Sequence, residues 1–219
     1  MTVIKVADTR YAMAFISAAW FGHPAEKLKV IGITGTKGKT TTTYLVKSIL
    51  ENAGYKVGLV GTIEVIIGDE HIHANNTTPE SYLLQEYFAR MVDAGLDTVV
   101  MEVSSQALML HRTQGFVFDY GIFTNLEPDH IGPNEHASFE EYLHCKGLLF
   151  KQCKVGIVNG DDEHWQAVTE GEPAAGAQAR RTGSDLPCDR SDEFCCGSTH
   201  ARQIQCVQCA GSHCHLPSF

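Results

Sequence analysis

Apolar residues recur along residues 1–170 at the two spacings that distinguish helices from strands. Spacings of three and four residues predict helices, and short runs rich in Val and Ile predict strands between them. Because the predicted strands and helices alternate, we expect an α/β fold with a mostly parallel sheet flanked by helices. The predicted helices span residues 7–20, 39–53, 78–95 and 138–150, and the predicted strands span 29–33, 56–63, 98–103, 116–125 and 154–158, with a hairpin over 64–74.

Two of the predicted helices begin at recognisable capping signals. Thr78 is followed by Pro79, a residue that suits the first position of a helix, so we expect Thr78 to be the N-cap of the third helix. Ser138 precedes Glu141 by three residues at the start of the fourth helix, which is the spacing of a capping box.

Charge and composition exclude several classes of protein. The 219 residues carry a formal charge of −9, which argues against a broad basic surface for DNA or RNA and favours small anionic substrates held in a local pocket. The sequence has no apolar run as long as the roughly 18 residues that a membrane helix needs, and residues 1–10 lack the zones of a signal peptide. We therefore expect a cytoplasmic protein without membrane insertion.

The run GITGTKGKTTT, from Gly32 to Thr42, lies between a predicted strand and a predicted helix. Glycines let the backbone approach phosphate oxygens, the N–H groups at the helix start bind the anion, and Lys39 adds positive charge. Ile33 stands where the general pattern G-x-x-x-x-G-K-[ST] has glycine, so a glycine-rich turn without a ligand is the alternative. The expected nucleotide-binding residues are Gly35, Thr36, Lys37, Gly38, Lys39, Thr40 and Thr41.

Three polar clusters, at residues 76–80, 102–106 and 124–130, follow predicted strands. Ligands of open α/β sheets lie outside the carboxyl ends of the strands, so these clusters are candidate site residues. Glu102 ends an apolar strand, where a carboxylate is costly to bury unless it binds a cation or a hydrogen-bond donor. Beside a phosphate loop, Mg²⁺ is the natural partner, and a glutamate on the exposed rim of the sheet is the alternative.

The order of five motifs resembles the Mur ligase family, and within it the MurE type. The motifs are T-G-T-x-G-K-T-T, N-T-T-P, E-V-S-S, T-N-L-x-x-D-H and a lysine, Lys146, on the following helix, and the resemblance runs from about Val6 to Glu170. Lys37 stands where asparagine is more usual and adds a charge near the phosphates.

The resemblance implies ATP-dependent amide formation. In this family a substrate carboxylate takes the γ-phosphoryl group, and the amine of an amino acid then displaces phosphate from the acyl phosphate. The MurE type adds the third amino acid to UDP-N-acetylmuramoyl-L-Ala-D-Glu in peptidoglycan synthesis. The implied cofactors are ATP and Mg²⁺, the implied partners are the UDP-muramoyl dipeptide and an amino acid, and we expect a monomer.

The resemblance also implies roles for individual residues. Lys146 aligns with the family lysine that is carbamylated by CO₂, and a carbamate turns this cation into an oxygen ligand suited to Mg²⁺. The implied catalytic residues are Lys39, Glu102, His130 and Lys146; the implied metal ligands are Thr40, Glu102, His130 and the Lys146 carbamate; and the implied contacts with the dipeptide substrate are Thr77, Thr78, Ser104 and Arg112.

The family pattern is matched by residues 29–170, as a partial central ATP-binding domain, and not by the two ends. Residues 1–28 resemble the linker that leaves an N-terminal uridine-binding domain, and we recognise neither that domain nor the C-terminal one, so we expect an inactive fragment. Residues 171–219 show no helical or strand period and hold six cysteines. Back-translation of 193–219 with one nucleotide dropped permits a family-like reading, which predicts an out-of-frame, disordered tail.

Three alternatives stay open. The tail could bind zinc through Cys206 and Cys209 with His213, Cys214 and His215. The whole chain could be a nucleotide-binding module without ligase chemistry. It could also be another ligase of the superfamily, such as a folylpolyglutamate synthase, although the motifs at residues 77–79 and 102–105 count against that interpretation.

Overall fold

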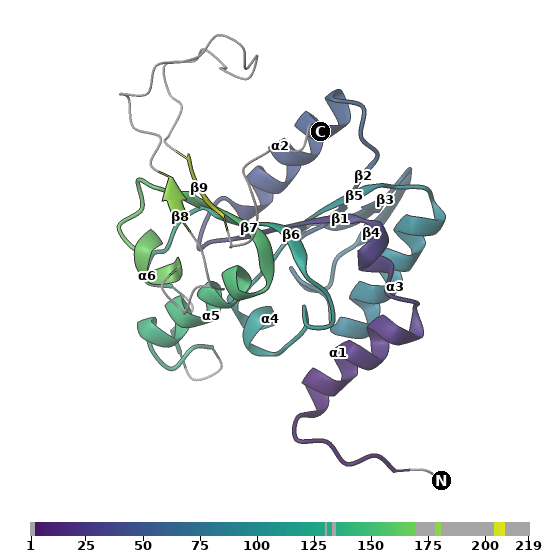
Figure 1. The fold of residues 1–219 in the computed structure, drawn as a ribbon, viewed down its shortest axis with the longest axis horizontal. Coiled ribbons are helices and arrows are strands. Elements are labelled where there is room, and N and C mark those ends of the chain that lie inside the picture. The colour runs from purple at the N-terminus through teal and green to yellow at the C-terminus, as the bar shows by residue number, and fades with distance from the viewer. Residues whose placement is uncertain (1–2, 130, 133–134, 170–177, 181–203, 209–219) are drawn as a thin grey trace.

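A single mixed sheet forms the centre of the molecule (Figure 1). The computed structural model describes residues 3–129, 131–132, 135–169, 178–180 and 204–208. The strand order is β4-β3-β2-β5-β1-β6-β7-β9-β8. The strands are β1 Lys29–Thr34, β2 Val57–Val60, β3 Glu64–Ile67, β4 Glu70–His73, β5 Thr98–Glu102, β6 Phe118–Phe123, β7 Cys153–Asn159, β8 Gln178–Arg180 and β9 Ile204–Gln208, and the helices are α1 Thr9–Trp20, a 3₁₀ helix η1 Pro24–Lys27, α2 Lys39–Asn52, α3 Ser81–Asp93, α4 Ser105–Met109, α5 Phe139–Lys151 and α6 Trp165–Thr169.

The middle of the sheet is parallel, as the alternation of strands and helices predicts. Strands β2, β5, β1, β6 and β7 pair in parallel, so their carboxyl ends meet at one edge. The hairpin β3–β4 continues the sheet antiparallel from β2, and β9 and β8 continue it antiparallel from β7. The predicted α/β fold is confirmed.

Helices cover the sheet on both faces (Figure 1), with α2 on one side and α3, α4 and α5 on the other. Successive residues of a strand face opposite sides of a sheet, and the core divides accordingly. Val30 and Val99 belong to the larger apolar cluster, which includes residues of α3 and α5. Their neighbours Ile31 and Val100 belong to the smaller cluster, against which residues of α2 pack.

Helix α1 packs through small residues. Asp8 caps it by accepting a hydrogen bond from the Tyr11 N–H, and the buried positions are Ala14, Ser17 and Ala18. A Cβ atom at Gly115 would lie 2.8 Å from the Ala14 carbonyl oxygen, and its φ of +90° is one that other residues rarely adopt. Glycine at this position therefore lets the chain after α4 pass close to α1.

The prediction that Thr78 caps helix α3 is wrong. The helix begins at Ser81 with Glu80 as its N-cap residue. The Thr78 hydroxyl instead donates to the Glu102 carbonyl oxygen at 2.9 Å and accepts from the Ser104 N–H at 3.1 Å. A tertiary contact with the end of β5 therefore prevails over the local capping signal.

The capping signal at Ser138 is confirmed, with a shift in its reciprocal bond. Ser138 Oγ accepts from the Glu141 N–H at 3.2 Å. The Glu141 carboxylate accepts from the Ala137 N–H at 2.6 Å, one residue before the position that a complete capping box uses.

Two backbone segments of the predicted disordered tail are strands in the structure. Strand β9 pairs with β7 and β8 pairs with β9, although the sequence pattern predicted no strand there. The side chains of the tail, including the proposed zinc ligands, lie outside the described residues, and the out-of-frame origin stays a prediction. In the described part of the chain, none of the helices has the length and apolar character needed to span a membrane.

Candidate nucleotide and substrate site

The glycine-rich run from Gly32 to Thr42, the phosphate loop, joins the carboxyl end of β1 to the start of α2, as the sequence predicts. Gly38 is the N-cap residue of α2 and has a left-handed φ of +80°. No side chain caps this helix start. Its first backbone N–H groups, which have no partner within the helix, can therefore bind an anion, as the loop motif requires.

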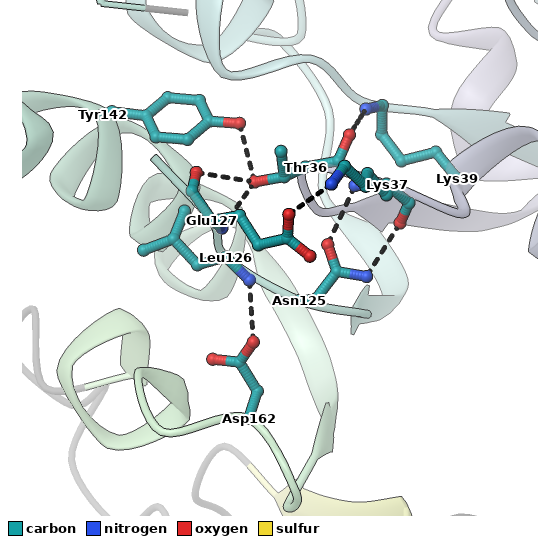
Figure 2. Close-up of polar contacts among 8 residues, drawn as sticks. All are labelled: Thr36, Lys37, Lys39, Asn125, Leu126, Glu127, Tyr142 and Asp162. Atoms are coloured by element: carbon teal, nitrogen blue, oxygen red, sulfur yellow. Dashed lines mark hydrogen bonds and ion pairs between the residues drawn. The ribbon is translucent and has the colours of Figure 1, made fainter. Parts of the chain in front are cut away.

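A second loop holds the phosphate loop in shape (Figure 2). The Thr36 N–H donates to the Asn125 carbonyl oxygen at 2.9 Å, and the Lys37 N–H donates to Asn125 Oδ1 at 2.8 Å. In return, Asn125 Nδ2 and Thr124 Oγ1 both donate to the Lys37 carbonyl oxygen, at 3.0 Å and 2.9 Å. The N–H and the carbonyl oxygen of Lys37 are thus both hydrogen-bonded to the second loop. The phosphate loop is therefore preorganised for a ligand.

The two lysines of the loop have different surroundings. Lys37 forms an ion pair with Glu127, and this hydrogen bond and its charge raise the pKa of Lys37. Lys39 Nζ donates to the carbonyl oxygens of Gly35 at 2.8 Å and Thr36 at 3.1 Å, and Figure 2 shows its contact with Thr36. Burial lowers the pKa of Lys39, and the charge of Glu102 opposes that shift.

Glu102 lies at the end of β5, and its side chain is almost completely buried, with a residue exposure of 1%. Its carboxylate accepts from the Thr62 N–H at 2.8 Å and from the hydroxyls of Thr62 at 3.1 Å and Thr40 at 3.0 Å. The alternative of a rim-exposed glutamate is therefore wrong. The structure gives this buried carboxylate donors that a bound cation could replace.

The spacing of Thr40 and Glu102 fits Mg²⁺. Mg²⁺ prefers octahedral oxygen ligands at about 2.0–2.1 Å, which places adjacent ligand oxygens about 2.9 Å apart. Thr40 Oγ1 and Glu102 Oε2 are 3.0 Å apart. The two oxygens can therefore occupy neighbouring positions around one ion. Among the described residues no group of three or more His, Cys, Asp or Glu side chains could hold a metal.

Lys146 is a buried lysine on α5, with a residue exposure of 1%. Its Nζ lies 4.4 Å from the centroid of the Tyr142 ring, and within the described part of the chain it forms no ion pair with a carboxylate. Burial, and secondarily the charge of Lys39, hold the pKa of Lys146 well below its usual value. The predicted metal ligand His130 lies outside the described residues.

A cavity of about 240 Å³ connects the phosphate loop to the predicted substrate residues. Lys39 lines one part of it, and Thr77, Ser104 and Arg112 line another. Thr78 is buried beneath this surface, and its carbonyl oxygen accepts from Arg112 Nη1 at 3.2 Å. The structure thus brings three of the four predicted substrate residues to the same cavity as the loop lysine.

Sequence reasoning missed one buried side chain of this cavity. His136 has an exposure of 2%, and its Nε2 lies 2.8 Å from Ser105 Oγ. A lone histidine in an aperiodic segment carries no signal that distinguishes it from a surface residue. Three other lining residues belong to the polar clusters that follow the predicted strands, and that position is the sequence feature that indicates them. They are Asn76, Ser105 and Gln106.

Comparison with known proteins places these features in one family. The family model described as the Mur ligase middle domain matches residues 33–191. UDP-N-acetylmuramoyl-L-alanyl-D-glutamate--2,6-diaminopimelate ligase 1 of Clostridium acetobutylicum is 53% identical over 167 residues, which cover 76% of this chain and 34% of that protein. The corresponding ligase of Bacillus licheniformis is 45% identical over 184 residues, covering 84% of this chain and 37% of that protein.

Solved structures agree with the sequence comparison. A UDP-N-acetylmuramoyl-L-alanyl-D-glutamate--2,6-diaminopimelate ligase superposes with a TM-score of 0.65 at 25% identity and covers 77% of this chain and 36% of its own. Escherichia coli FolC in complex with ADP superposes with a TM-score of 0.53 at 21% identity, covering 77% of this chain and 45% of its own, a likeness of fold alone. The chain spans about a third of the length of the curated ligases that it matches.

Proposed function

This chain belongs to the Mur ligase family, and we propose that its phosphate loop binds Mg²⁺–ATP for amide-bond formation in peptidoglycan synthesis. The observation that carries the proposal is the arrangement of Lys39 beside the Thr40–Glu102 pair, at a cavity whose other residues include Arg112. A cation on the loop, a pair of oxygen ligands for Mg²⁺ and an arginine at the cavity, which pairs with Glu80 at 2.8 Å, are groups that can stabilise phosphoryl transfer to a carboxylate.

For the whole protein that contains this domain, we propose the reaction named in its relatives. The substrates are UDP-N-acetylmuramoyl-L-Ala-D-Glu and an amino acid, with 2,6-diaminopimelate as the amino acid because the similar ligases carry that name. We propose a monomeric enzyme of the cytoplasm. Because both substrates are small and polar, binding them requires neither a nucleic acid nor a membrane. Since this chain spans about a third of those ligases, the complete reaction is assigned to the whole protein.

The proposed chemistry proceeds in two steps. An oxygen of the substrate carboxylate attacks the γ-phosphorus of ATP, the bond to ADP breaks, and an acyl phosphate forms. The amine of the amino acid then attacks the acyl carbon, and phosphate leaves as the amine loses a proton. Negative charge develops on oxygens throughout, so Lys39 and Arg112 stabilise it by their position around the cavity.

Mg²⁺ would supply Lewis-acid stabilisation of the phosphate oxygens. Thr40 and Glu102 would hold one ion, while His130 and a carbamate on Lys146 complete the proposed ligands. The buried Lys146 amine, whose pKa is lowered, loses its proton more readily than an exposed lysine. The neutral amine then adds to CO₂, which gives the carbamate and releases one proton.

Equilibrium binding of Mg²⁺–ATP to this chain tests the nucleotide site. We expect saturable, Mg²⁺-dependent binding that Lys39→Ala weakens by at least about tenfold, because a charge-assisted contact with phosphate is lost. Lys47→Ala is the matched control, because Lys47 lies on the same helix and pairs with Glu51 outside the cavity. Equal affinities for the wild type, Lys39→Ala and Lys47→Ala, or no binding by the wild type, would count against the proposal.

A further inference from the structure

One tyrosine connects the phosphate loop to the buried lysine of α5. The Tyr142 hydroxyl lies 3.0 Å from Thr36 Oγ1 (Figure 2). The ring of the same residue lies under Lys146, with Nζ 4.4 Å from the ring centroid. All three residues are buried, and Tyr142 has no exposed surface. The two ends of a single side chain therefore contact two parts of the proposed site.

Thr36 Oγ1 has three polar groups within hydrogen-bond distance, and Tyr142 is one of them. Thr36 Oγ1 accepts from the Glu127 N–H at 3.0 Å and lies 3.3 Å from the Glu127 carbonyl oxygen, which can only accept. A threonine hydroxyl has one proton and two lone pairs. When the Thr36 proton goes to the carbonyl oxygen, Tyr142 donates to the remaining lone pair, and when it goes to Tyr142, the tyrosine hydroxyl accepts it. Helix α5 thus takes part in fixing the position of the phosphate loop.

The charge on the Lys146 side chain determines whether it attracts or repels the face of the Tyr142 ring. An ammonium is attracted to the negative face of an aromatic ring, and an anion is repelled by it. Carbamylation would place a negatively charged group at this face. Because the ring hydroxyl is bonded to Thr36, a shift of the ring is transmitted to the loop that binds phosphate.

We propose that Tyr142 is a positioning residue that couples occupancy of the phosphate loop to carbamylation of Lys146. This inference rests on the proposed function and adds a route between two parts of one site. Coupling of this kind is reciprocal: the factor by which Mg²⁺–ATP changes the affinity of Lys146 for CO₂ is the factor by which carbamylation changes the affinity for Mg²⁺–ATP.

The test measures the Lys146 carbamate by ¹³C NMR in the presence of ¹³C-labelled bicarbonate, with and without Mg²⁺–ATP. The ratio of the two apparent CO₂ affinities is the coupling factor. Tyr142→Phe keeps the ring and removes the hydroxyl, and we expect it to reduce the coupling factor by about threefold to tenfold, the worth of one hydrogen bond. Tyr87→Phe removes a hydroxyl from the core at α3 and is the matched control.

A double-mutant cycle locates the effect at the Thr36–Tyr142 contact. Tyr142→Phe should reduce the coupling factor in the wild-type background and have no further effect in a Thr36→Val background. Thermal unfolding of each variant establishes that it is folded. A merely structural role predicts that Tyr142→Phe leaves the coupling factor unchanged, and that result would overturn the inference.

The outcomes for the wild-type chain separate this inference from the function on which it rests. Failure of the wild type to bind Mg²⁺–ATP would overturn the proposed function, and binding without any carbamate would overturn its carbamate step, each together with the present inference. The inference alone fails when the wild type binds Mg²⁺–ATP, carries a carbamate that responds to it, and has the same coupling factor as Tyr142→Phe.

Discussion

Gly35 is the position where a single methyl group should disrupt the phosphate loop most directly. A Cβ atom built on Gly35 would lie 1.9 Å from Thr124 Oγ1, whereas real Cβ contacts are longer than about 3.0 Å. Thr124 Oγ1 must therefore move, although it donates to the Lys37 carbonyl oxygen at 2.9 Å. Gly35 also has a φ of +154°, which L side chains rarely adopt.

These terms give the expected cost of Gly35→Ala. Overpacking contributes about 1–3 kcal/mol, loss of the Thr124 hydrogen bond about 0.5–1.5 kcal/mol, and backbone strain about 1 kcal/mol. We expect the free energy of unfolding to fall by about 3–5 kcal/mol. Mg²⁺–ATP affinity should fall as well, because the loop can no longer keep the shape that Asn125 and Thr124 impose on it.

Urea unfolding and calorimetric titration with Mg²⁺–ATP measure the two effects. Gly54→Ala is the control, because Gly54 also has a positive φ, of +94°, but nothing lies within 4 Å of its Cβ position. We expect it to cost only about 1–2 kcal/mol and to leave nucleotide binding unchanged. Thr124→Ala should partly rescue Gly35→Ala by removing the clashing oxygen. Equal destabilisation by Gly35→Ala and Gly54→Ala, or no rescue, would refute this reasoning.

Three further substitutions test other parts of the site. Glu102→Gln should weaken Mg²⁺–ATP binding by at least about tenfold but leave metal-free ATP binding little changed, because the lost charge faces the ion; equal loss in both titrations would contradict this. Thr78→Val should lower the free energy of unfolding by about 1–3 kcal/mol, because it leaves the partly buried Ser104 N–H without its acceptor, and urea unfolding checks it. Lys146→Met should stabilise the CO₂-free chain, most strongly at low pH. Because burial lowers the folded-state pKa of Lys146, the unfolded chain binds the additional proton between that pKa and the usual one, so wild-type stability rises with pH through this window. If the difference in urea midpoint between Lys146→Met and the wild type did not change with pH, that result would contradict the lowered pKa of the buried Lys146.

Local patterns predicted the elements that depend on local spacing. The strand–loop–helix unit around Gly38 and the capping of α5 by Ser138 follow from residues that are neighbours in sequence. The parallel middle of the sheet follows from alternation of strands and helices. The polar clusters after the strands predicted part of the cavity, because carboxyl ends of parallel strands share one edge.

The errors arose where distant contacts decide the structure. Thr78 and Pro79 have the composition of a helix start, yet the Thr78 hydroxyl bonds to the end of β5, and the helix begins at Ser81. His136 reaches the cavity through a bond to Ser105, thirty-one positions away in sequence. Strand β9 depends on pairing with β7, and no period in its own residues indicates that partner.

A structure of the chain with Mg²⁺ and a non-hydrolysable ATP analogue tests the central claim most directly. The account predicts phosphate oxygens on the backbone N–H groups at the start of α2, with Lys39 turned from the Gly35 carbonyl oxygen toward them. It also predicts one Mg²⁺ bound by Thr40 Oγ1, with the Glu102 carboxylate at the same ion. A nucleotide bound elsewhere, or phosphates on the loop with Thr40 still bonded to Glu102 and no ion between them, would contradict it.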